Sequence, residues 1–341
     1  MFDFTSDYNI GAHPLVLDRL IETNLERLPG YGADKYCSLA EEKIKAAANA
    51  PDAKVYFLSG GTQTNAVAIS AILRSYQGVI SAQSGHIAVH EAGAIEYTGH
   101  KVITLPESDG KLVPKVLEGF FADYYSDQSR EHTVMPGAVY ISQPTEYGTL
   151  YSLSELEKIS EICKRYSAYL YIDGARLGYA FVSEKNDTSL SDIARLCDIF
   201  YIGGTKVGAL FGEALVVTNP ELCSCFRSTI KQHGALFAKG GIIGVQFDAL
   251  FTDDSYLKIA KIAVERAMEL RNALISRGCR MFIDSYTNQQ FVIVENSKLE
   301  LLSEKARFTV WQRYDENHTV IRLVTNFATT KEEIEAVAAL I

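Results

Sequence analysis

The sequence lacks the features of a membrane-spanning or secreted protein. None of its 341 residues lies in a run of about 18 apolar residues, which excludes a transmembrane helix. Residues 1–5 contain neither the basic nor the apolar region of a secretory signal. We therefore predict a cytoplasmic protein with no membrane partner.

Positive charge and paired cysteines are also scarce. The 33 Lys and Arg residues are outnumbered by 42 Asp and Glu residues, so the formal net charge is −9. A protein that binds a nucleic-acid backbone needs a basic face, so we expect no nucleic-acid partner. The six cysteines contain no CxxC pair, and residues 223–225 alone offer too few ligands for zinc. We expect six reduced thiols.

Short β-branched and aromatic runs alternate with helical patterns through most of the chain. The predicted strands are residues 55–58, 79–81, 101–105, 138–143, 169–172, 198–202 and 214–218. Helical patterns at residues 63–74, 86–97 and 154–166 lie between them. This alternation is typical of βαβ units, and strands that are apolar throughout indicate a sheet covered on both faces. We predict an α/β fold with a mostly parallel seven-stranded sheet flanked by helices.

The pattern changes near residue 252. Residues 255–277 form one long amphipathic pattern that ends at Gly278, followed by predicted strands at 290–295 and 320–324 and a helix at 331–341. The chain also exceeds the roughly 250–300 residues at which a single core stops growing. We divide it into an N-terminal segment (1–50), a large α/β domain (51–251) and a small C-terminal α/β domain (252–341).

Three polar features follow predicted strands, where ligands bind in open α/β sheets. Residues 59–65 combine glycines with a helix N-terminus, which suits a phosphate, with the Thr62 and Thr64 hydroxyls as further donors. The alternative is a plain glycine turn before an N-cap threonine. Asp173 is either a ligand of a charged group or the partner of Arg176. Lys206 is either a surface group or a nucleophile.

Together these features match the needs of one cofactor. Pyridoxal phosphate requires a phosphate cradle, a lysine for a Schiff base, and an acid that keeps the pyridinium nitrogen protonated. Residues 59–65, Lys206 and Asp173 supply these three parts.

A pair of histidines leaves another interpretation open. His86 and His90 are four residues apart, with Glu91 beside them, so they could form part of a metal site. The segment is not HExxH and a third ligand is not evident. We therefore predict no metal.

Seven motifs in order resemble those of the low-specificity L-threonine aldolases, in the β-eliminating lyase group of fold-type I pyridoxal-phosphate enzymes. They are residues 4–7, 30–34, 59–65, 86–93, 173–176 (Asp-Gly-Ala-Arg), Lys206 and residues 321–325. The resemblance implies a pyridoxal 5'-phosphate-dependent aldehyde-lyase that cleaves L-threonine or L-allo-threonine into glycine and an aldehyde. It also implies a homodimer or homotetramer with sites at the dimer interface.

The same resemblance implies roles for individual residues. The catalytic residues would be Lys206, His86 and Asp173. The cofactor would be bound by Gly60, Gly61, Thr62, His86, Asp173, Ala175, Arg176 and Lys206. The substrate would be bound by Ser6, Tyr31, Arg176 and Arg322, with Tyr31 reaching the neighbouring subunit's site. The base acting on the substrate hydroxyl would be His86 or a water beside it.

The sequence departs from the family pattern at three places, one of which is the Gly-Gly-Thr-Lys-Val segment around Lys206, where the family commonly reads Ser-Lys-Gly. Residues 143–147 read Gln-Pro-Thr-Glu-Tyr where many threonine aldolases read Glu-Asn-Thr-His-Asn. Gly241 stands where family members often carry an arginine, which Lys231 or Lys239 could replace. Two alternatives therefore stay open: another pyridoxal-phosphate-dependent amino-acid β-eliminating lyase, or a non-catalytic protein that keeps the fold.

Overall fold

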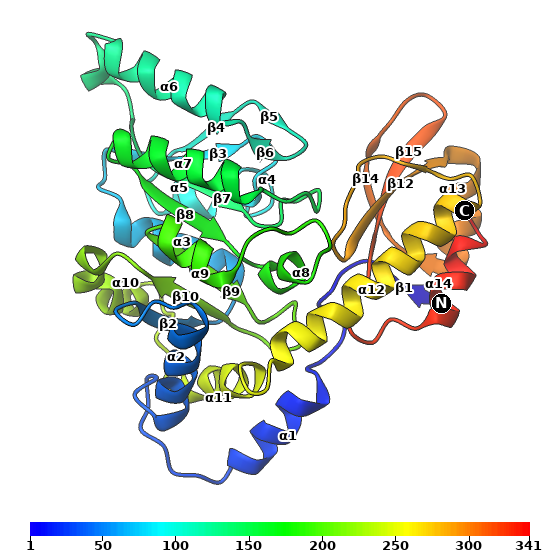
Figure 1. Ribbon diagram of the computed structural model, residues 1–341, viewed down its shortest axis with the longest axis horizontal. Coiled ribbons are helices and arrows are strands. Elements are labelled where there is room, and N and C mark those ends of the chain that lie inside the picture. The colour runs from blue at the N-terminus through cyan, green and yellow to red at the C-terminus, as the bar shows by residue number, and fades with distance from the viewer.

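A mixed seven-stranded sheet forms the centre of the protein, described here from a computed structural model (Figure 1). The structure describes residues 1–341, except for the side chain of Cys225. The strand order is β2-β10-β9-β8-β7-β3-β4. In that order the strands span Lys54–Leu58, Glu213–Val217, Ile199–Gly203, Tyr169–Asp173, Met135–Ser142, Gln77–Ala82 and Val102–Leu105. Only β10 is antiparallel to its neighbours, so the predicted α/β fold with a mostly parallel seven-stranded sheet is confirmed.

Both faces of this sheet are covered, which explains why its strands are apolar throughout. In β8, Leu170 and Ile172 face one core cluster and Tyr171 faces the other. The helices that contribute to the first cluster include α2 (Lys35–Ala47), α6 (Pro114–Ser126), α7 (Leu153–Arg165), α9 (Leu190–Leu196) and α11 (Gly241–Leu250). Those that contribute to the second include α3 (Gly61–Ile72) and α10 (Phe226–Gln232).

The predicted helix over residues 86–97 is wrong as a single element. The structure has two short helices, α4 (His86–Val89) and α5 (Ala94–Tyr97). Between them Ala92 and Gly93 adopt φ angles of 51° and 74°. A right-handed helix cannot continue through this left-handed region. The turn also buries Glu91, which lies just before it.

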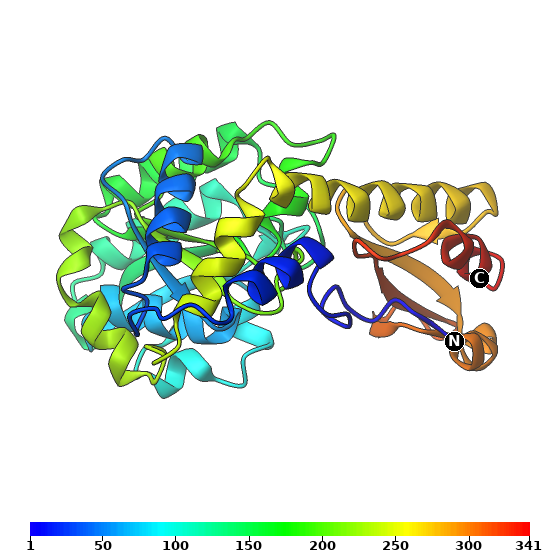
Figure 2. The same ribbon diagram turned by 90° about the horizontal axis from the view of Figure 1, so that it is seen from below.

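A smaller antiparallel sheet follows the long helix α12 (Ser255–Ser276), which runs from the large part of the molecule to the small part (Figure 2). Gly278, with a φ of 85°, lies just past its end, as predicted. The sheet order is β11-β12-β15-β14, spanning Arg280–Met281, Gln289–Glu295, His318–Val324 and Thr309–Arg313. Helices α13 (Asn296–Lys305) and α14 (Lys331–Ala338) complete this part. The sequence predicted β12, β15 and α14, but not β14 or α13.

The N-terminal segment connects the two parts. β1 (Phe2–Asp3) pairs with β13 (Ala306–Arg307) beside the small sheet, and the chain then crosses to α1 (Pro14–Thr23). Figure 2 shows this crossing in blue. The remaining short elements are β5 (Glu107–Ser108), β6 (Lys111–Leu112), α8 (Leu177–Phe181) and the 3-10 helices Arg130–His132 and Pro220–Cys225. Among the described residues, no helix has both the length and the apolar character needed to cross a membrane.

Candidate active site

A cavity of about 790 Å³ lies between the carboxyl ends of the large sheet's strands and the small sheet. Figure 1 shows α4 and α8 on the side of the large sheet that faces the small part. The predicted site residues that line this cavity are Ser6, His86, Arg176, Lys206 and Arg322. The cavity volume is typical of a small-molecule site.

Asp173 ends β8 and is buried beneath this cavity, with 4% of its surface exposed. Its Oδ2 accepts hydrogen bonds from the Tyr140 hydroxyl (2.5 Å) and the Asn65 amide (3.2 Å), and its Oδ1 accepts one from the Ala175 N–H (3.0 Å). Arg176 pairs with another acid, so the interpretation of Asp173 as the partner of Arg176 is wrong. Among the described residues, no cation pairs with Asp173.

Asn65 links Asp173 to His86. The Asn65 amide also donates to Glu91 Oε1 (2.8 Å), and Glu91 Oε1 lies 3.0 Å from His86 Nδ1. The Tyr171 hydroxyl donates to Asn65 Oδ1 (2.6 Å), which fixes the amide orientation. An ionised Glu91 places the proton of His86 on Nδ1.

The surroundings of His86 decide its protonation. Burial on its own would lower the pKa of His86, but the hydrogen bond to Glu91 and the nearby Glu146 and Asp173 carboxylates outweigh this effect and raise it. His86 therefore favours the protonated form more than an ordinary histidine does. Sequence reasoning assigned no role to Asn65 or Glu91, although both fall inside the family-like motifs, because their partners are far away in the chain.

Lys206 is carried by a glycine loop after β9. A Cβ atom on Gly203 would lie 2.1 Å from the Ala175 carbonyl oxygen, and one on Gly204 would lie 2.6 Å from the Gly212 carbonyl oxygen. Glycine at these positions therefore lets the chain pass close to the segment after β8 and to the segment before β10. Burial and the Arg176 charge lower the pKa of Lys206. A lowered pKa leaves more of the amine neutral and nucleophilic.

Glu213 lies on the strand beside this loop and was not singled out from the sequence. Its carboxylate accepts a hydrogen bond from the Gly204 N–H (2.9 Å). Burial raises the pKa of Glu213 to about 7. No sequence signal distinguishes this glutamate from a surface one.

The glycine loop after β2 forms the start of α3. Gly60 is the N-cap, and the Thr64 N–H is bonded to the Gly60 carbonyl oxygen (2.9 Å). The N–H groups of Gly61, Thr62 and Gln63 precede the first helical bond and suit an anion. The Thr64 hydroxyl also donates to Gly60 O (2.9 Å) and is buried, so its predicted role as a ligand donor is wrong. The alternative of an N-cap threonine is wrong as well.

The two arginines of the cavity differ in their partners. Arg176 donates from Nε and Nη2 to the Asp7 carboxylate at 2.8 and 3.0 Å, and Asn288 also donates to Asp7 (2.9 Å). One edge of the Arg176 guanidinium is therefore already occupied, a contact that the sequence did not predict. Arg322 has only bonds of 3.3–3.4 Å to Gln289, Thr5 and Thr309, and it lies 5.1 Å from the Trp311 ring centre.

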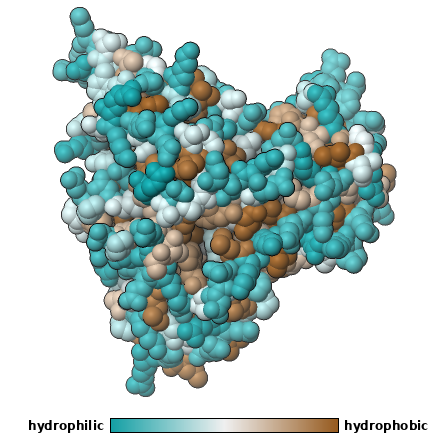
Figure 3. Space-filling view, in the orientation of Figure 1, coloured by the Kyte–Doolittle hydropathy of each residue, from teal (hydrophilic) through white to brown (hydrophobic). Residues whose placement is uncertain are grey.

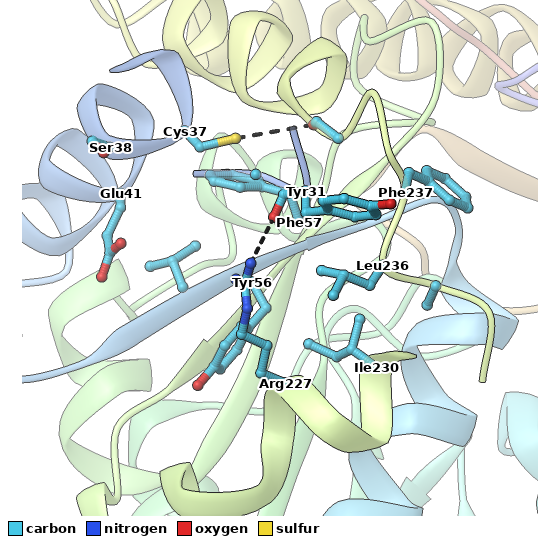
Figure 4. A pocket seen from close by; sticks show the side chains of 14 residues that line it. Tyr31, Cys37, Ser38, Glu41, Tyr56, Phe57, Arg227, Ile230, Leu236 and Phe237 are labelled. Atoms are coloured by element: carbon cyan, nitrogen blue, oxygen red, sulfur yellow. Dashed lines mark hydrogen bonds between the residues drawn. The ribbon is translucent and has the colours of Figure 1, made fainter. Parts of the chain in front are cut away.

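Tyr31 lies outside this cavity. It lines a separate pocket with Arg227, which donates to the Tyr31 carbonyl oxygen (3.1 Å) (Figure 4). The Lys231 ammonium lies 5.0 Å from the Tyr31 ring centre. A Cβ atom on Gly241 would approach the Asp34 carboxylate to 2.7 Å, which explains why no arginine stands there. Lys239 is exposed.

No metal centre is evident in the part of the chain that the structure describes. His86 and His90 lie with ring centres 5.6 Å apart, but no group of three or more His, Cys, Asp or Glu side chains could hold a metal ion. The side chain of Cys225, one of the predicted reduced thiols, lies outside the described residues.

Comparisons with known proteins show which family the chain belongs to. The model of the β-eliminating lyase family matches residues 3–297. The chain belongs to the β-eliminating lyase family. This lyase is 28% identical to the low specificity L-threonine aldolase of Pseudomonas aeruginosa over 315 residues. The aligned region covers 91% of this chain and 88% of that protein. A solved threonine aldolase structure from Leishmania major is 42% identical, has a TM-score of 0.96 and covers 100% of this chain and 98% of that one.

The predicted family, fold type and cofactor are thereby confirmed: the chain is a fold-type I lyase dependent on pyridoxal phosphate. The donor set of the cavity fits this cofactor. Asp173 offers a buried carboxylate without a cationic partner among the described residues, α3 offers free N–H groups, and Lys206 offers an amine with a lowered pKa.

Proposed function

We propose that this lyase cleaves L-threonine and L-allo-threonine into glycine and acetaldehyde. The observation that carries the proposal is the meeting of Lys206, Arg176 and Arg322 in one cavity above the buried Asp173. This arrangement provides an amine, two carboxylate-binding cations and an acid for the cofactor ring. The 42% identity to the Leishmania major threonine aldolase, over the whole chain, supports the choice of substrate.

The cofactor would be held by residues of the large sheet's edge. The α3 N–H groups of Gly61 and Thr62 would bind the phosphate, Asp173 would pair with the pyridinium nitrogen, and His86 would face the ring. When bound, pyridoxal phosphate supplies an electron-accepting ring that stabilises negative charge at the substrate's Cα. Gly60 and Ala175 shape the backbone around this site.

The substrate would be oriented from the other wall. Arg322, Ser6 and the free edge of Arg176 bind the carboxylate, because a guanidinium matches a carboxylate in shape and charge. Holding the carboxylate sets which bond at Cα faces the ring, and Lys206 is the group nearest to exchange with the substrate amine. The cation of Arg322 is the less occupied of the two, which suits a group that binds and releases substrate.

Cysteine desulfuration has weaker support. A cysteine desulfurase of Clostridium botulinum is 27% identical over 184 residues, which cover 52% of this chain. Sulfur transfer would need an available thiol at the site, yet none of the described cysteine side chains lines the cavity. Burial also raises the pKa of Cys163 and Cys197, which makes these thiols poor nucleophiles.

We also propose a cytoplasmic homodimer or homotetramer, with Tyr31 reaching the partner's site. Helix α1 supports an interface, because Ile21 in this helix and Leu25 just after it are 73% and 92% exposed. Figure 3 shows hydrophobic surface near the foot of the molecule, where Figure 1 places α1. We propose, separately, that the chain divides into an N-terminal segment, a large domain and a small domain at residues 50 and 251.

The test is to incubate the purified protein, loaded with pyridoxal phosphate, with L-threonine, L-allo-threonine and L-cysteine in turn. We expect acetaldehyde and glycine from the first two. Pyruvate and ammonia from L-cysteine, without acetaldehyde from the other two, would instead support a β-eliminating activity. A protein that gains no visible absorption band on cofactor addition would support the non-catalytic alternative.

A further inference from the structure

Glu146 differs from the other acids around the cavity. It lines the cavity yet is only 8% exposed. Asp7, Glu91 and Asp173 all accept hydrogen bonds from neighbouring side chains. The Glu146 carboxylate has no hydrogen bond or ion pair within the part of the chain that the structure describes. This carboxylate lines the cavity and is free of protein partners there, so it is available to a ligand.

The charges that face Glu146 come from every wall of the cavity. Lys206 and Arg176 belong to the large part, Arg322 belongs to the small sheet, and His86 belongs to α4; the Glu146 charge affects the pKa of each of them. Glu146 therefore lies within reach of the groups that would hold the substrate's amine and carboxylate. A β-hydroxy-α-amino acid also carries a β-carbon with a hydroxyl group. This substituent must occupy the part of the cavity that the amine and carboxylate sites leave free.

His90 also lines the cavity, but it is exposed. Of the two less exposed side chains there that could accept a proton, Glu146 and His86, His86 is the weaker candidate. Its Nδ1 already donates to Glu91, and the surrounding acids favour its protonated form. A protonated imidazole cannot take a further proton. Glu146 has both oxygens free of protein partners among the described residues, and general bases must lie within hydrogen-bond reach of the proton they remove.

We infer that the Glu146 carboxylate binds the substrate's β-hydroxyl group and accepts its proton as the Cα–Cβ bond breaks. The O–H electron pair becomes the second bond of the aldehyde carbonyl, and the Cα–Cβ pair stays on Cα. Cα then takes a proton to give glycine, and Glu146 returns its own proton to the solvent. This inference rests on the proposed function, and it replaces His86 or a water as the expected base.

The experiment compares two reactions of Glu146→Gln in the holoenzyme. The first is L-threonine cleavage, which needs a base for the hydroxyl. The second is exchange of a glycine Cα hydrogen with D₂O, followed by NMR, which uses the same cofactor and arginines but no hydroxyl. We expect cleavage to fall by about 10²–10⁴-fold, the usual contribution of a general base, while exchange stays near the wild-type rate.

Matched controls make the result specific. Glu157→Gln, on the outer face of α7, should leave both rates unchanged, because its side chain is 43% exposed and pairs only with Arg195. Glu146→Asp, which keeps a carboxylate, should recover part of the cleavage. If Glu146→Gln loses its cofactor absorption, the same comparison is made with Glu146→Ala.

Two results would overturn the inference. Cleavage at the wild-type rate would show that Glu146 is not the base, and an equal fall in both reactions would assign it to the cofactor or the fold. Failure of the proposed function is a different outcome, because wild-type enzyme would then exchange glycine hydrogen without producing acetaldehyde.

Discussion

The two walls of the cavity are built differently. On the large-sheet wall, Asp173, Asn65, Glu91 and His86 form one chain of hydrogen bonds of 2.8–3.2 Å. On the small-sheet wall, Arg322 has bonds of 3.3–3.4 Å, and its buried Nε has no partner among the described residues. Within that chain Glu91 Oε2 is the atom that is buried without a partner among the described residues. A closely bonded network resists rearrangement, whereas an incompletely paired cation favours an incoming anion.

This difference teaches which half of the site is preorganised. In the proposed function the large wall would be ready for the cofactor, because preorganised polar groups stabilise charge without moving. The small wall would be completed by substrate. The Asp7–Arg176 ion pair, together with Asn288, joins the N-terminal segment and both walls, so it holds the two halves in register.

The largest loss of activity is expected when the Lys206 amine is removed from the large-sheet wall. Lys206→Ala should lower L-threonine cleavage by at least about 10³-fold, as expected when a covalent catalyst is lost. The visible absorption band of the loaded enzyme should also disappear. Lys158→Ala, an exposed lysine of α7, serves as the control. Cleavage by Lys206→Ala at a substantial rate would refute the assigned nucleophile.

Removing the charge of Asp173 tests the same wall more gently. Asp173→Asn keeps the shape but loses the negative charge that would face the cofactor nitrogen. We expect threonine cleavage and glycine hydrogen exchange to fall together, by about 10²–10³-fold, measured as kcat. This joint loss contrasts with Glu146→Gln. If exchange alone survives in Asp173→Asn, its assignment to the cofactor is wrong.

The small wall should respond in substrate affinity. Arg322→Gln should raise KM for L-threonine by about 10–100-fold, since an ionic hydrogen bond contributes about 1.5–3 kcal/mol. Arg313→Gln, on the exposed β14 of the same sheet, should leave KM unchanged. If Arg322→Gln changed kcat alone, the small-sheet wall would act on the reacting bond as the large-sheet wall does. The proposed difference between the two walls would then be wrong.

The smallest effect is on stability beneath the Lys206 loop. Burial raises the folded-state pKa of Glu213 from 4.5 to about 7. Its protonated form therefore stabilises the fold below pH 4.5, and this contribution is lost as the pH rises through about 7. It amounts to about 3 kcal/mol at most.

Urea unfolding of wild type and Glu213→Gln between pH 5 and pH 8 measures this contribution. The variant should lose less stability than wild type as the pH rises, because glutamine does not ionise. Parallel pH dependences of the two proteins would show that Glu213 keeps an ordinary pKa.

Much of the fold was predictable because its signals are local. All seven strands of the large sheet follow from short apolar runs, and Asp173 and Lys206 follow from their places at strand ends. The prediction failed at residues 92–93, where two left-handed residues interrupt a helical pattern. It also missed β14, because the burial pattern of that strand mixes exposed and half-buried residues.

The sequence by itself determined the family, the parallel sheet and the positions of Asp173 and Lys206 at strand ends, because apolar runs, glycine loops and motif order are properties of neighbouring residues. Only the tertiary structure decided which side chains contact one another across the chain. Arg176 meets Asp7 across 169 positions, Asn65 meets Asp173 across 108, and Gly241 excludes an arginine because it packs on Asp34. Glu146 was a departure from a motif in the sequence. It became a candidate base only when folding buried it among cations and left it without a partner.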